Sequence, residues 1–356
     1  MKLLILTQKV DINDNNLGFF HRWIEEFAKH CESIIVVCLQ KGEYHLPFNV
    51  KILSSGKEKK YSRIRYLWNF YKYIFSERGN YDAVFVHMNK EYVLLGGPLW
   101  KLWNKKIALW YTHKAVGWQL KLAEKLVDKI FTASKESFRL PSSKVEITGH
   151  GIDVEHFDPA QFPSFYDLQK ELRLLAVGRI SPVKDFATVI KGLTFFCNNL
   201  LKRDINPDYV VSLNIIGEPI TEADKFYQSE IVELKNKQGV SWYLNFMGGQ
   251  SYNQMPLHYN RHHILIHTSR TGSIDKVVLE ALASGRLVIT SSEAFADLAK
   301  EGLVYTFPEG DYQELAKTIE KIYNSGIILL NKKGVDFVKK NHNLADVIVK
   351  ILNYFK

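Results

Sequence analysis

The chain has 356 residues, of which 46% are hydrophobic and 24% charged, and these values exclude a wholly disordered chain, a collagen and a coiled coil. The formal net charge of +9 indicates an anionic partner, such as a membrane surface, a nucleic acid or an acidic substrate. Residues 1–160 hold 24 Lys and Arg against 17 Asp and Glu, so most of the excess lies in the first half. The three scattered cysteines predict neither a disulfide framework nor a metal site, which favours a reducing, cytoplasmic setting.

Short apolar runs alternate with helical patterns along the chain. In the first half, the predicted strands are 2–7, 33–39, 83–87, 107–112 and 129–133, and helical spacing occurs at 19–31 and 61–76. The series restarts after residue 160, with strands at 172–177, 210–216, 243–247, 263–267 and 287–290. Continuous apolar runs are typical of parallel strands covered on both faces. The pattern therefore predicts an α/β chain with two Rossmann-like, doubly wound parallel-sheet domains facing across a cleft.

Two blocks in the second half carry polar chemistry at strand ends. In the first block, Arg179 and Lys184 follow a strand that ends at Gly178, and a helix is predicted to begin near Lys184. Two cations beside a helix N-terminus can hold a diphosphate. The alternative is a solvated loop with two ordinary surface charges.

The second block is the polar turn 269–275, which leads into a helix predicted at 276–284. The small residues Gly272 and Ser273 let the backbone approach a phosphate closely. Glu280 lies one helical turn beyond Lys276 and can hold a ribose diol. The alternative is a helix capped by Ser273 that carries a surface ion pair between Lys276 and Glu280.

In this order and separation, the two blocks resemble glycosyltransferase family 4, retaining enzymes with the GT-B fold. Further residues of this sequence match the family's pattern, namely Gly18 after the first strand, His113 at the end of a middle strand, the turn at 150–157, and Gly217 and Gly248 at later strand ends. The resemblance implies that Arg179 and Lys184 form a diphosphate clamp. It also implies that His113 lies near the donor sugar or the acceptor and that Glu280 binds the ribose.

One residue departs from the family's pattern. The family usually has two glutamates separated by seven residues; the second matches Glu280, whereas the first falls on Gly272. In relatives, that first glutamate contacts hydroxyls of the transferred sugar. We expect Asp275 and Lys276 to supply substitute contacts, the carboxylate to sugar hydroxyls and the ammonium to phosphate.

The resemblance implies transfer of a sugar, with retention, from a UDP- or GDP-linked donor to a glycan or lipid-linked acceptor. Residues 1–160 would then bind the acceptor and 161–340 the donor, with 151–170 as the linker and a C-terminal helix at 341–356 crossing back to the first domain. Because the two cations can stabilise the leaving diphosphate and no Asp-x-Asp stands at a strand end, no metal or other cofactor is expected. The alternatives are a nucleotide-sugar epimerase or hydrolase of this fold, and a non-catalytic basic binding protein. No nucleic-acid motif occurs, so a nucleic-acid partner is not expected.

The segment 57–78 holds seven basic and seven aromatic residues. Its predicted apolar stripe, which should pack on the first sheet, is Ile64, Leu67, Trp68, Tyr71, Ile74 and Phe75. The aromatic residues left over are Tyr61, Tyr66, Phe70 and Tyr73, beside Lys59, Lys60, Arg63 and Arg65. Such a face suits anionic lipid, which predicts peripheral binding to the cytoplasmic face of the membrane.

Overall fold

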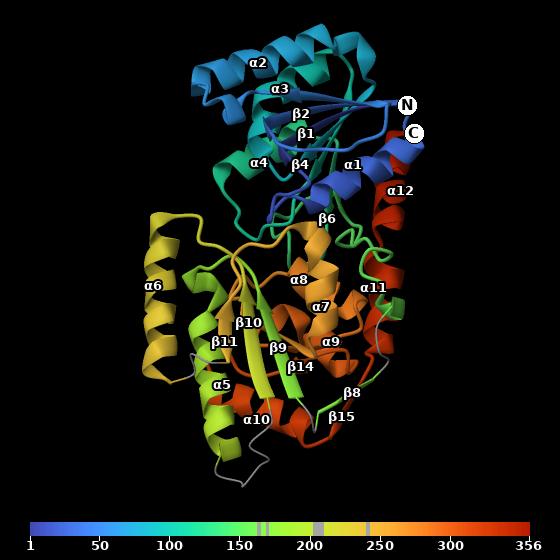
Figure 1. Ribbon diagram of the computed structural model, residues 1–356. Coiled ribbons are helices and arrows are strands. Elements are labelled where there is room, and N and C mark those ends of the chain that lie inside the picture. The colour runs from blue at the N-terminus through green and yellow to red at the C-terminus, as the bar shows by residue number, and fades with distance from the viewer. Residues whose placement is uncertain (162–164, 169–170, 202–209, 240–242) are drawn as a thin grey trace. The chain divides into compact units, whose positions relative to one another are not determined.

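The computed structural model describes residues 1–161, 165–168, 171–201, 210–239 and 243–356 (Figure 1). The chain divides into two compact units, each with its own core. Unit 1 comprises Met1–Asp153, Ser251–Asn253 and Asn341–Lys356, and unit 2 comprises Val154–Gln250 and Gln254–Lys340. The division at Asp153 falls inside the predicted linker 151–170, of which positions 162–164 and 169–170 lie outside the described residues.

Unit 1 is built on a seven-stranded sheet in the order β3-β2-β1-β4-β5-β6-β7. Its strands are β1 (Lys2–Val10), β2 (Ser33–Lys41), β3 (Val50–Ser54), β4 (Ala83–His87), β5 (Lys106–Trp110), β6 (Lys129–Thr132) and β7 (Val145–Ile147). All neighbouring strands are parallel, which confirms the predicted arrangement. The sequence did not predict β3 and β7, because these edge strands have no buried residue and so lack a continuous apolar run.

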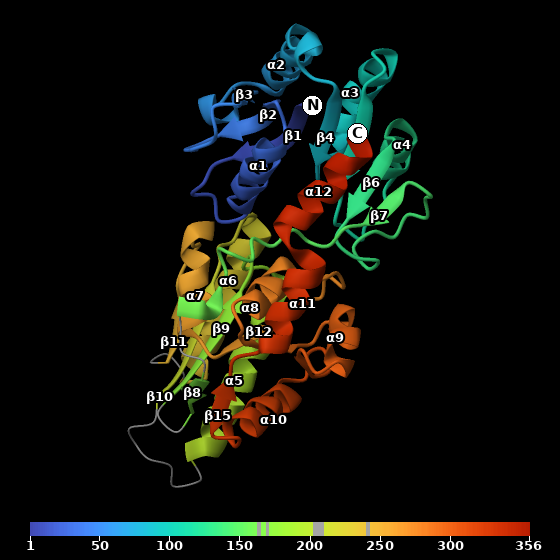
Figure 2. The ribbon, with the colours of Figure 1, turned by 90° about the vertical axis from the view of Figure 1, so that its right-hand side faces the viewer.

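Helices cover both faces of the sheet of unit 1 (Figure 2). They are α1 (Phe19–His30), α2 (Arg63–Ser76), α3 (Lys90–Leu102), α4 (Trp118–Leu126) and α12 (Leu344–Phe355). Helices α1 and α12 share one apolar cluster with the sheet, and α2, α3 and α4 share another. The C-terminal helix α12 buries one stripe of its apolar residues, namely Leu344, Val347, Ile348, Ile351, Leu352 and Phe355.

The packing of α2 corrects the predicted apolar stripe. Phe70 and Ile74 are buried among residues of the sheet, whereas Ile64, Trp68 and Phe75 are exposed. Helix α2 carries apolar side chains on two sides, and periodicity alone does not tell which side meets the sheet. Hydrogen bonds favour the side that is buried, because Asn69 Nδ2 donates to Ser55 O at 2.9 Å and the Tyr73 hydroxyl donates to Ser54 O at 3.1 Å.

Unit 2 has a six-stranded parallel sheet in the order β11-β10-β9-β12-β13-β14. Its strands are β9 (Glu171–Val177), β10 (Val210–Ile216), β11 (Leu244–Phe246), β12 (Ile264–His267), β13 (Leu287–Thr290) and β14 (Tyr305–Thr306). A separate antiparallel pair is formed by β8 (Phe165–Asp167) and β15 (Ile327–Leu329). The two parallel sheets establish the predicted fold class of two Rossmann-like α/β units.

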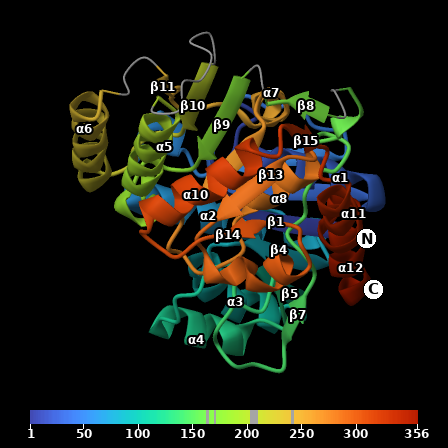
Figure 3. The same cartoon turned by 90° about the horizontal axis from the view of Figure 1, so that it is seen from below.

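The helices of unit 2 are α5 (Phe186–Leu201), α6 (Glu222–Lys237), α7 (Met255–Arg261), α8 (Lys276–Ala283), α9 (Ala296–Lys300), α10 (Tyr312–Tyr323) and α11 (Lys332–His342), whose last two residues belong to unit 1. Helices α5 and α10 lie side by side over the sheet (Figure 3). The helix predicted to begin near Lys184 begins two residues later, because Pro182–Lys184 form a 3₁₀ turn and Asp185 has a φ of +48°. Within the described ranges, no helix is both long enough and apolar enough to cross a membrane.

Candidate functional site

Glycine turns follow three neighbouring strands of unit 2 at one edge of the sheet. The Gly217 N–H donates to Gly248 O at 2.9 Å, and the Gly178 N–H donates to Ile216 O at 2.9 Å. A Cβ atom on Gly217 would lie 1.9 Å from Gly178 O, so only glycine allows these turns to approach so closely. This edge, at the carboxyl ends of β9, β10 and β11, is where doubly wound sheets bind ligands.

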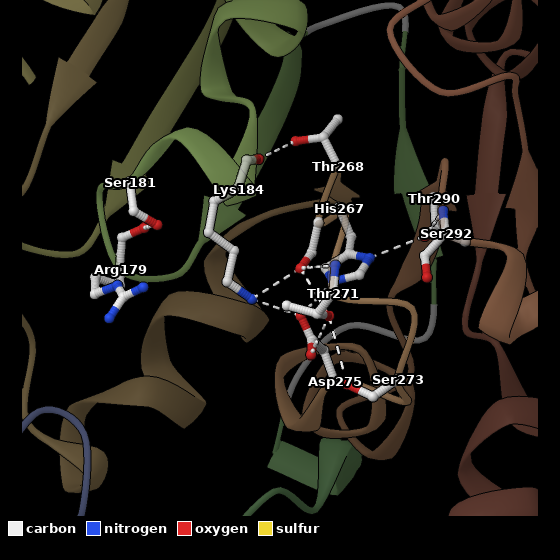
Figure 4. Close-up of polar contacts among 11 residues, drawn as sticks. Arg179, Ser181, Lys184, His267, Thr268, Thr271, Ser273, Asp275, Thr290 and Ser292 are labelled. Atoms are coloured by element: carbon white, nitrogen blue, oxygen red, sulfur yellow. Dashed lines mark hydrogen bonds and ion pairs between the residues drawn. The ribbon is translucent and has the colours of Figure 1, made fainter. Parts of the chain in front are cut away.

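Arg179 and Lys184 leave this edge on the loop that follows β9. The Cδ and Cε atoms of Lys184 lie 3.3 Å from the position that a Cβ of Gly178 would take, so the lysine stem crosses directly over that glycine. The Lys184 side chain is 17% exposed. Arg179 is 42% exposed, its Nε lies 3.8 Å from Asp224 Oδ2, and Figure 4 shows it directed away from the partners of Lys184. On this loop, Lys184 is therefore a mostly buried cation, whereas Arg179 is a partly exposed one.

The turn that follows β12 holds the Lys184 loop in place. The Thr268 hydroxyl donates to Lys184 O at 2.6 Å, and the Arg270 N–H donates to Val183 O at 2.9 Å. The Arg270 guanidinium also donates to Asp185 Oδ2 at 2.7 Å. The two sequence blocks predicted to bind phosphate are therefore joined by direct hydrogen bonds.

A compact polar group, which we call the Lys184 cluster, is centred on Asp275 (Figure 4). It comprises Lys184, His267, Ser269, Thr271 and Asp275. The Lys184 ammonium lies 2.5 Å from Asp275 Oδ2 and 3.1 Å from Ser269 Oγ. The Thr271 hydroxyl donates to Asp275 Oδ1 at 3.2 Å. Both oxygens of the carboxylate thus accept hydrogen bonds from side chains of unit 2.

His267, the last residue of β12, connects Asp275 to the next strand. Its Nε2 lies 2.9 Å from Asp275 Oδ2, and its Nδ1 lies 2.9 Å from Thr290 Oγ1. The Ser292 N–H donates to the same threonine oxygen at 3.1 Å. These partners fit a neutral ring that donates from Nε2 to the carboxylate and accepts the Thr290 hydroxyl at Nδ1.

Burial and neighbouring charged groups determine the ionisation of His267 and Asp275 in the Lys184 cluster. Burial lowers the pKa of His267 and outweighs its bond to Asp275, which favours the neutral ring. Burial alone would raise the pKa of Asp275, but the Lys184 charge and the bond from His267 place that pKa far below its usual range. Asp275 is therefore ionised at every physiological pH, and it provides a fixed anion beside Lys184.

Glu280 lies on α8 and is buried. The Tyr259 hydroxyl donates to Glu280 Oε2 at 2.9 Å. Burial raises the pKa of Glu280 to about 7, although the Lys276 charge and the bond from Tyr259 act in the opposite direction. A buried carboxyl is not half of a surface ion pair, so that alternative is wrong. The residue at the N-cap of α8 is Asp275 and not Ser273.

Three further residues of unit 2 are predicted to bind substrate. Gly272 and Ser273 lie in the turn before α8, and Lys276 is the first residue of α8. Gly272 has a φ of +61°, a conformation that costs other residues roughly 1 kcal/mol. A glutamate in this backbone conformation would be strained. The Ser273 hydroxyl donates to Thr271 Oγ1 at 3.4 Å, and Lys276 begins α8.

Gly18 and His113 belong to unit 1. Gly18 is the N-cap of α1, and His113 lies in the loop that follows β5. His113 is exposed, and its Nδ1 accepts the Ala115 N–H at 3.1 Å. The other predicted site residues all lie in unit 2, where Lys184 and Asp275 are in direct contact.

Reasoning from the sequence missed His267 and Tyr259, and it assigned no separate role to Ser269 and Thr271 within the turn 269–275. His267 carried a usable signal, since a polar residue at the carboxyl end of a buried strand points to the ligand edge of a parallel sheet. No group of three or more His, Cys, Asp or Glu side chains that could hold a metal ion occurs in the part of the chain that the structure describes. All three cysteines are buried and free.

The chain is similar to known proteins in one segment of its sequence and in its fold. Residues 171–325 match the family described as glycosyl transferases group 1, whereas the curated proteins give no significant match. Among solved structures, Anabaena HepE in complex with UDP and glucose has a TM-score of 0.75 at 16% identity, over 99% of both chains. Sucrose-phosphate synthase from Thermosynechococcus elongatus has a TM-score of 0.75 at 14% identity, over 100% of this chain and 98% of that one. WaaG, a glycosyltransferase involved in lipopolysaccharide biosynthesis, has a TM-score of 0.68 at 13% identity, over 99% of each chain. The whole chain therefore has the GT-B fold.

Proposed function

We propose that the chain is a glycosyltransferase that moves a sugar from a nucleotide-diphosphate sugar to a glycan or lipid-linked acceptor. The Lys184 cluster carries this proposal, because it fixes a cation at the ligand edge of unit 2, in the segment that matches group 1 glycosyl transferases. Arg179 lies on the same loop. The turns at Gly178, Gly217 and Gly248 place main-chain groups at the carboxyl ends of the strands. Together these groups suit a diphosphate.

The chemistry that the cations would support is departure of the nucleoside diphosphate. As the bond from the sugar to the β-phosphate oxygen breaks, negative charge grows on that phosphate. Lys184, which its partners already hold in place, and Arg179 would stabilise this charge with little reorganisation. We infer that transfer is metal-independent and retains the anomeric configuration, as the family resemblance implies.

We assign Asp275 a positioning role instead of the expected contact with sugar hydroxyls. Its oxygens already accept hydrogen bonds from Lys184, His267 and Thr271. Such a carboxylate directs the ammonium of Lys184. Glu280 remains our proposed ligand of the ribose, and Lys276, at the N-terminus of α8, remains a proposed phosphate contact.

The acceptor side is proposed for unit 1, where the exposed His113 follows β5. The basic excess of residues 1–160 suits an anionic or lipid-linked acceptor at the cytoplasmic membrane face. UDP and GDP are both candidate donor nucleotides, and the similarity to HepE, whose structure is a complex with UDP and glucose, favours UDP.

A thermal-shift panel of UDP, GDP, ADP and their sugars tests the donor site. A ligand at 100 times its dissociation constant stabilises the folded protein by about 2.7 kcal/mol, so the correct nucleotide should raise the melting temperature. No response to any nucleoside diphosphate would contradict the proposal. The same panel with Lys184→Ala is the matched control, since this variant should lose the response.

Incubation of the donor with and without a panel of acceptors separates transfer from the competing reactions. A transferase consumes donor only with an acceptor, whereas an epimerase or hydrolase converts the donor alone. Proton NMR of the product should show the donor's anomeric configuration, and a chelator should leave the rate unchanged.

A further inference from the structure

Helix α2 presents a continuous apolar surface to solvent. The α2 surface comprises Ile64, Leu67, Trp68 and Phe75 of α2 with Leu102 and Trp103 beyond it, together with the cations Arg63, Arg65, Lys72 and Arg78. Ile64 is 82% exposed, Trp68 51% and Leu102 75%. The rings of Phe75 and Trp103 meet edge to face at 5.1 Å, so the surface continues past α2. Scattered exposed apolar residues are ordinary, but a contiguous set indicates a binding surface.

The cations of this surface lie over its aromatic rings. Arg65 lies 4.6 Å from the ring centre of Trp68, Lys72 lies 5.2 Å from the same ring, and Arg78 lies 5.5 Å from Trp103. No acidic residue occurs between Lys59 and Ser76 in the sequence. Within the described part of the chain, no carboxylate lies within ion-pair distance of any of these three cations. The surface is therefore both apolar and electropositive.

We propose that the α2 surface docks on an anionic lipid bilayer, with its cations among the headgroups and its apolar side chains at the headgroup–acyl boundary. A nucleic acid or an acidic peptide would satisfy the arginines but would leave Ile64, Leu67 and Leu102 in water. A bilayer accounts for both components, because it offers negative charge directly above hydrocarbon. Aromatic rings beside cations suit the same interface, where one side is wet and the other apolar. This docking is independent of the donor chemistry of unit 2.

Co-sedimentation with neutral and with one-third phosphatidylglycerol vesicles, across a salt series, tests the docking. The charge variant is R63Q/R65Q/K72Q, and the apolar variant is I64S/L67S/W68S. The control makes comparable changes on α6 of unit 2, with three lysines neutralised in K225Q/K235Q/K237Q and one exposed apolar residue replaced in F226S. Each variant is first checked for an unchanged melting temperature and an unchanged thermal response to nucleotide.

The wild type should bind the anionic vesicles much more tightly than the neutral ones. At 0.1 M salt, the charge variant should bind roughly 100-fold more weakly, since each basic residue near anionic lipid contributes about fivefold. At 1 M salt, where charges are screened beyond about 3 Å, only the apolar contribution remains, and the apolar variant should lose it. The control should bind as the wild type does.

Equal binding to both vesicle types, no binding to either, or an equal loss in the α6 control would overturn the proposal. Binding to an oligonucleotide or an acidic peptide without binding to vesicles would also overturn it, in favour of a different anionic partner. Because the nucleotide response is recorded on the same samples, failure of the docking is distinguishable from failure of the proposed transferase activity.

Discussion

The two units place their cations in opposite ways. In unit 2, Lys184 is held by Asp275 and Ser269, and its side chain is mostly buried. In unit 1, Arg65 and Lys72 of the α2 surface lie over the half-exposed ring of Trp68, and no acidic residue occurs between Lys59 and Ser76. The first arrangement fixes a single charge at a defined point. The second spreads several charges over an apolar surface.

This difference indicates what each region is suited to bind. A fixed charge with little to reorganise stabilises charge that develops on one group, such as the phosphate of a leaving diphosphate. Several cations spread over an apolar surface suit an extended anionic partner, because no single contact determines binding. The comparison can be tested in both units, because each arrangement predicts a different response when one residue is replaced.

The largest expected effect distinguishes the two sides of α2. Phe70→Ala should destabilise the protein by roughly 3–5 kcal/mol, because its ring is 2% exposed in the core of unit 1. Trp68→Ala should change stability by less than about 0.5 kcal/mol, since its ring faces solvent. Urea unfolding of both variants measures this. Equal losses would show that Trp68 is a core residue and would remove the basis of the α2 surface.

The second-largest expected effect is a loss of turnover when Lys184 is replaced. Lys184→Ala should lower turnover by roughly 10²–10³-fold, as expected when a preorganised group that stabilises transition-state charge is removed. Arg179→Ala should lower it as well. Steady-state kinetics with the nucleotide sugar identified by thermal shift provides the measurement. Near-normal turnover in both single variants would exclude the proposed diphosphate clamp.

The sequence predicted the strands of both sheet centres because buried parallel strands are continuous apolar runs. It also predicted the residues of the Lys184 loop, since their position relative to a strand end is a local property of the chain. Which side of α2 is buried is not local. That choice depends on Phe70 meeting the sheet and on the bonds from Asn69 and Tyr73 to Ser55 and Ser54.

The sequence also did not predict that Asp275 positions Lys184. The carboxylate could be placed beside a phosphate-binding turn, but its partners come from β12 and from the loop after β9. Such contacts between distant segments have no periodicity, and they appear only when the chain is folded. His267 was missed for the same reason, although its position at a strand end was visible.

A smaller effect sharpens the assignment of Asp275. Asp275→Asn keeps the shape but removes the anion that directs Lys184, and we expect turnover to fall roughly 10–100-fold, the range for a charge-assisted hydrogen bond. A positioning role lowers kcat without raising the KM for the donor, whereas a sugar contact would raise that KM. Asp297→Asn, which changes an exposed carboxylate on α9, is the control and should have little effect. Recovery of kcat in Asp275→Glu would support positioning.

The smallest effect tests the buried Glu280. Its pKa of about 7 lies above that of an exposed glutamate, so the folded protein holds a proton that the unfolded chain has already released. Its contribution to stability is therefore complete below about pH 4.5 and is lost as the pH rises through about 7. Glu280→Gln cannot ionise, so its melting temperature should lack this decline.

The same substitution decides whether Glu280 acts on the nucleotide. If its carboxylate holds the ribose, Glu280→Gln should bind the free nucleoside diphosphate roughly tenfold more weakly, since one hydrogen bond to a charged group is worth about 1.5–3 kcal/mol and the amide keeps part of it. Tyr259→Phe is the matched control, because it removes the internal partner of Glu280 and leaves the carboxyl in place. Calorimetric titration of each variant with the nucleotide measures this. Unchanged affinity in Glu280→Gln, together with loss of the pH-dependent melting, would limit Glu280 to a structural role in the core of unit 2. Weaker binding in Glu280→Gln, with unchanged binding in Tyr259→Phe, would identify Glu280 as the residue that holds the ribose.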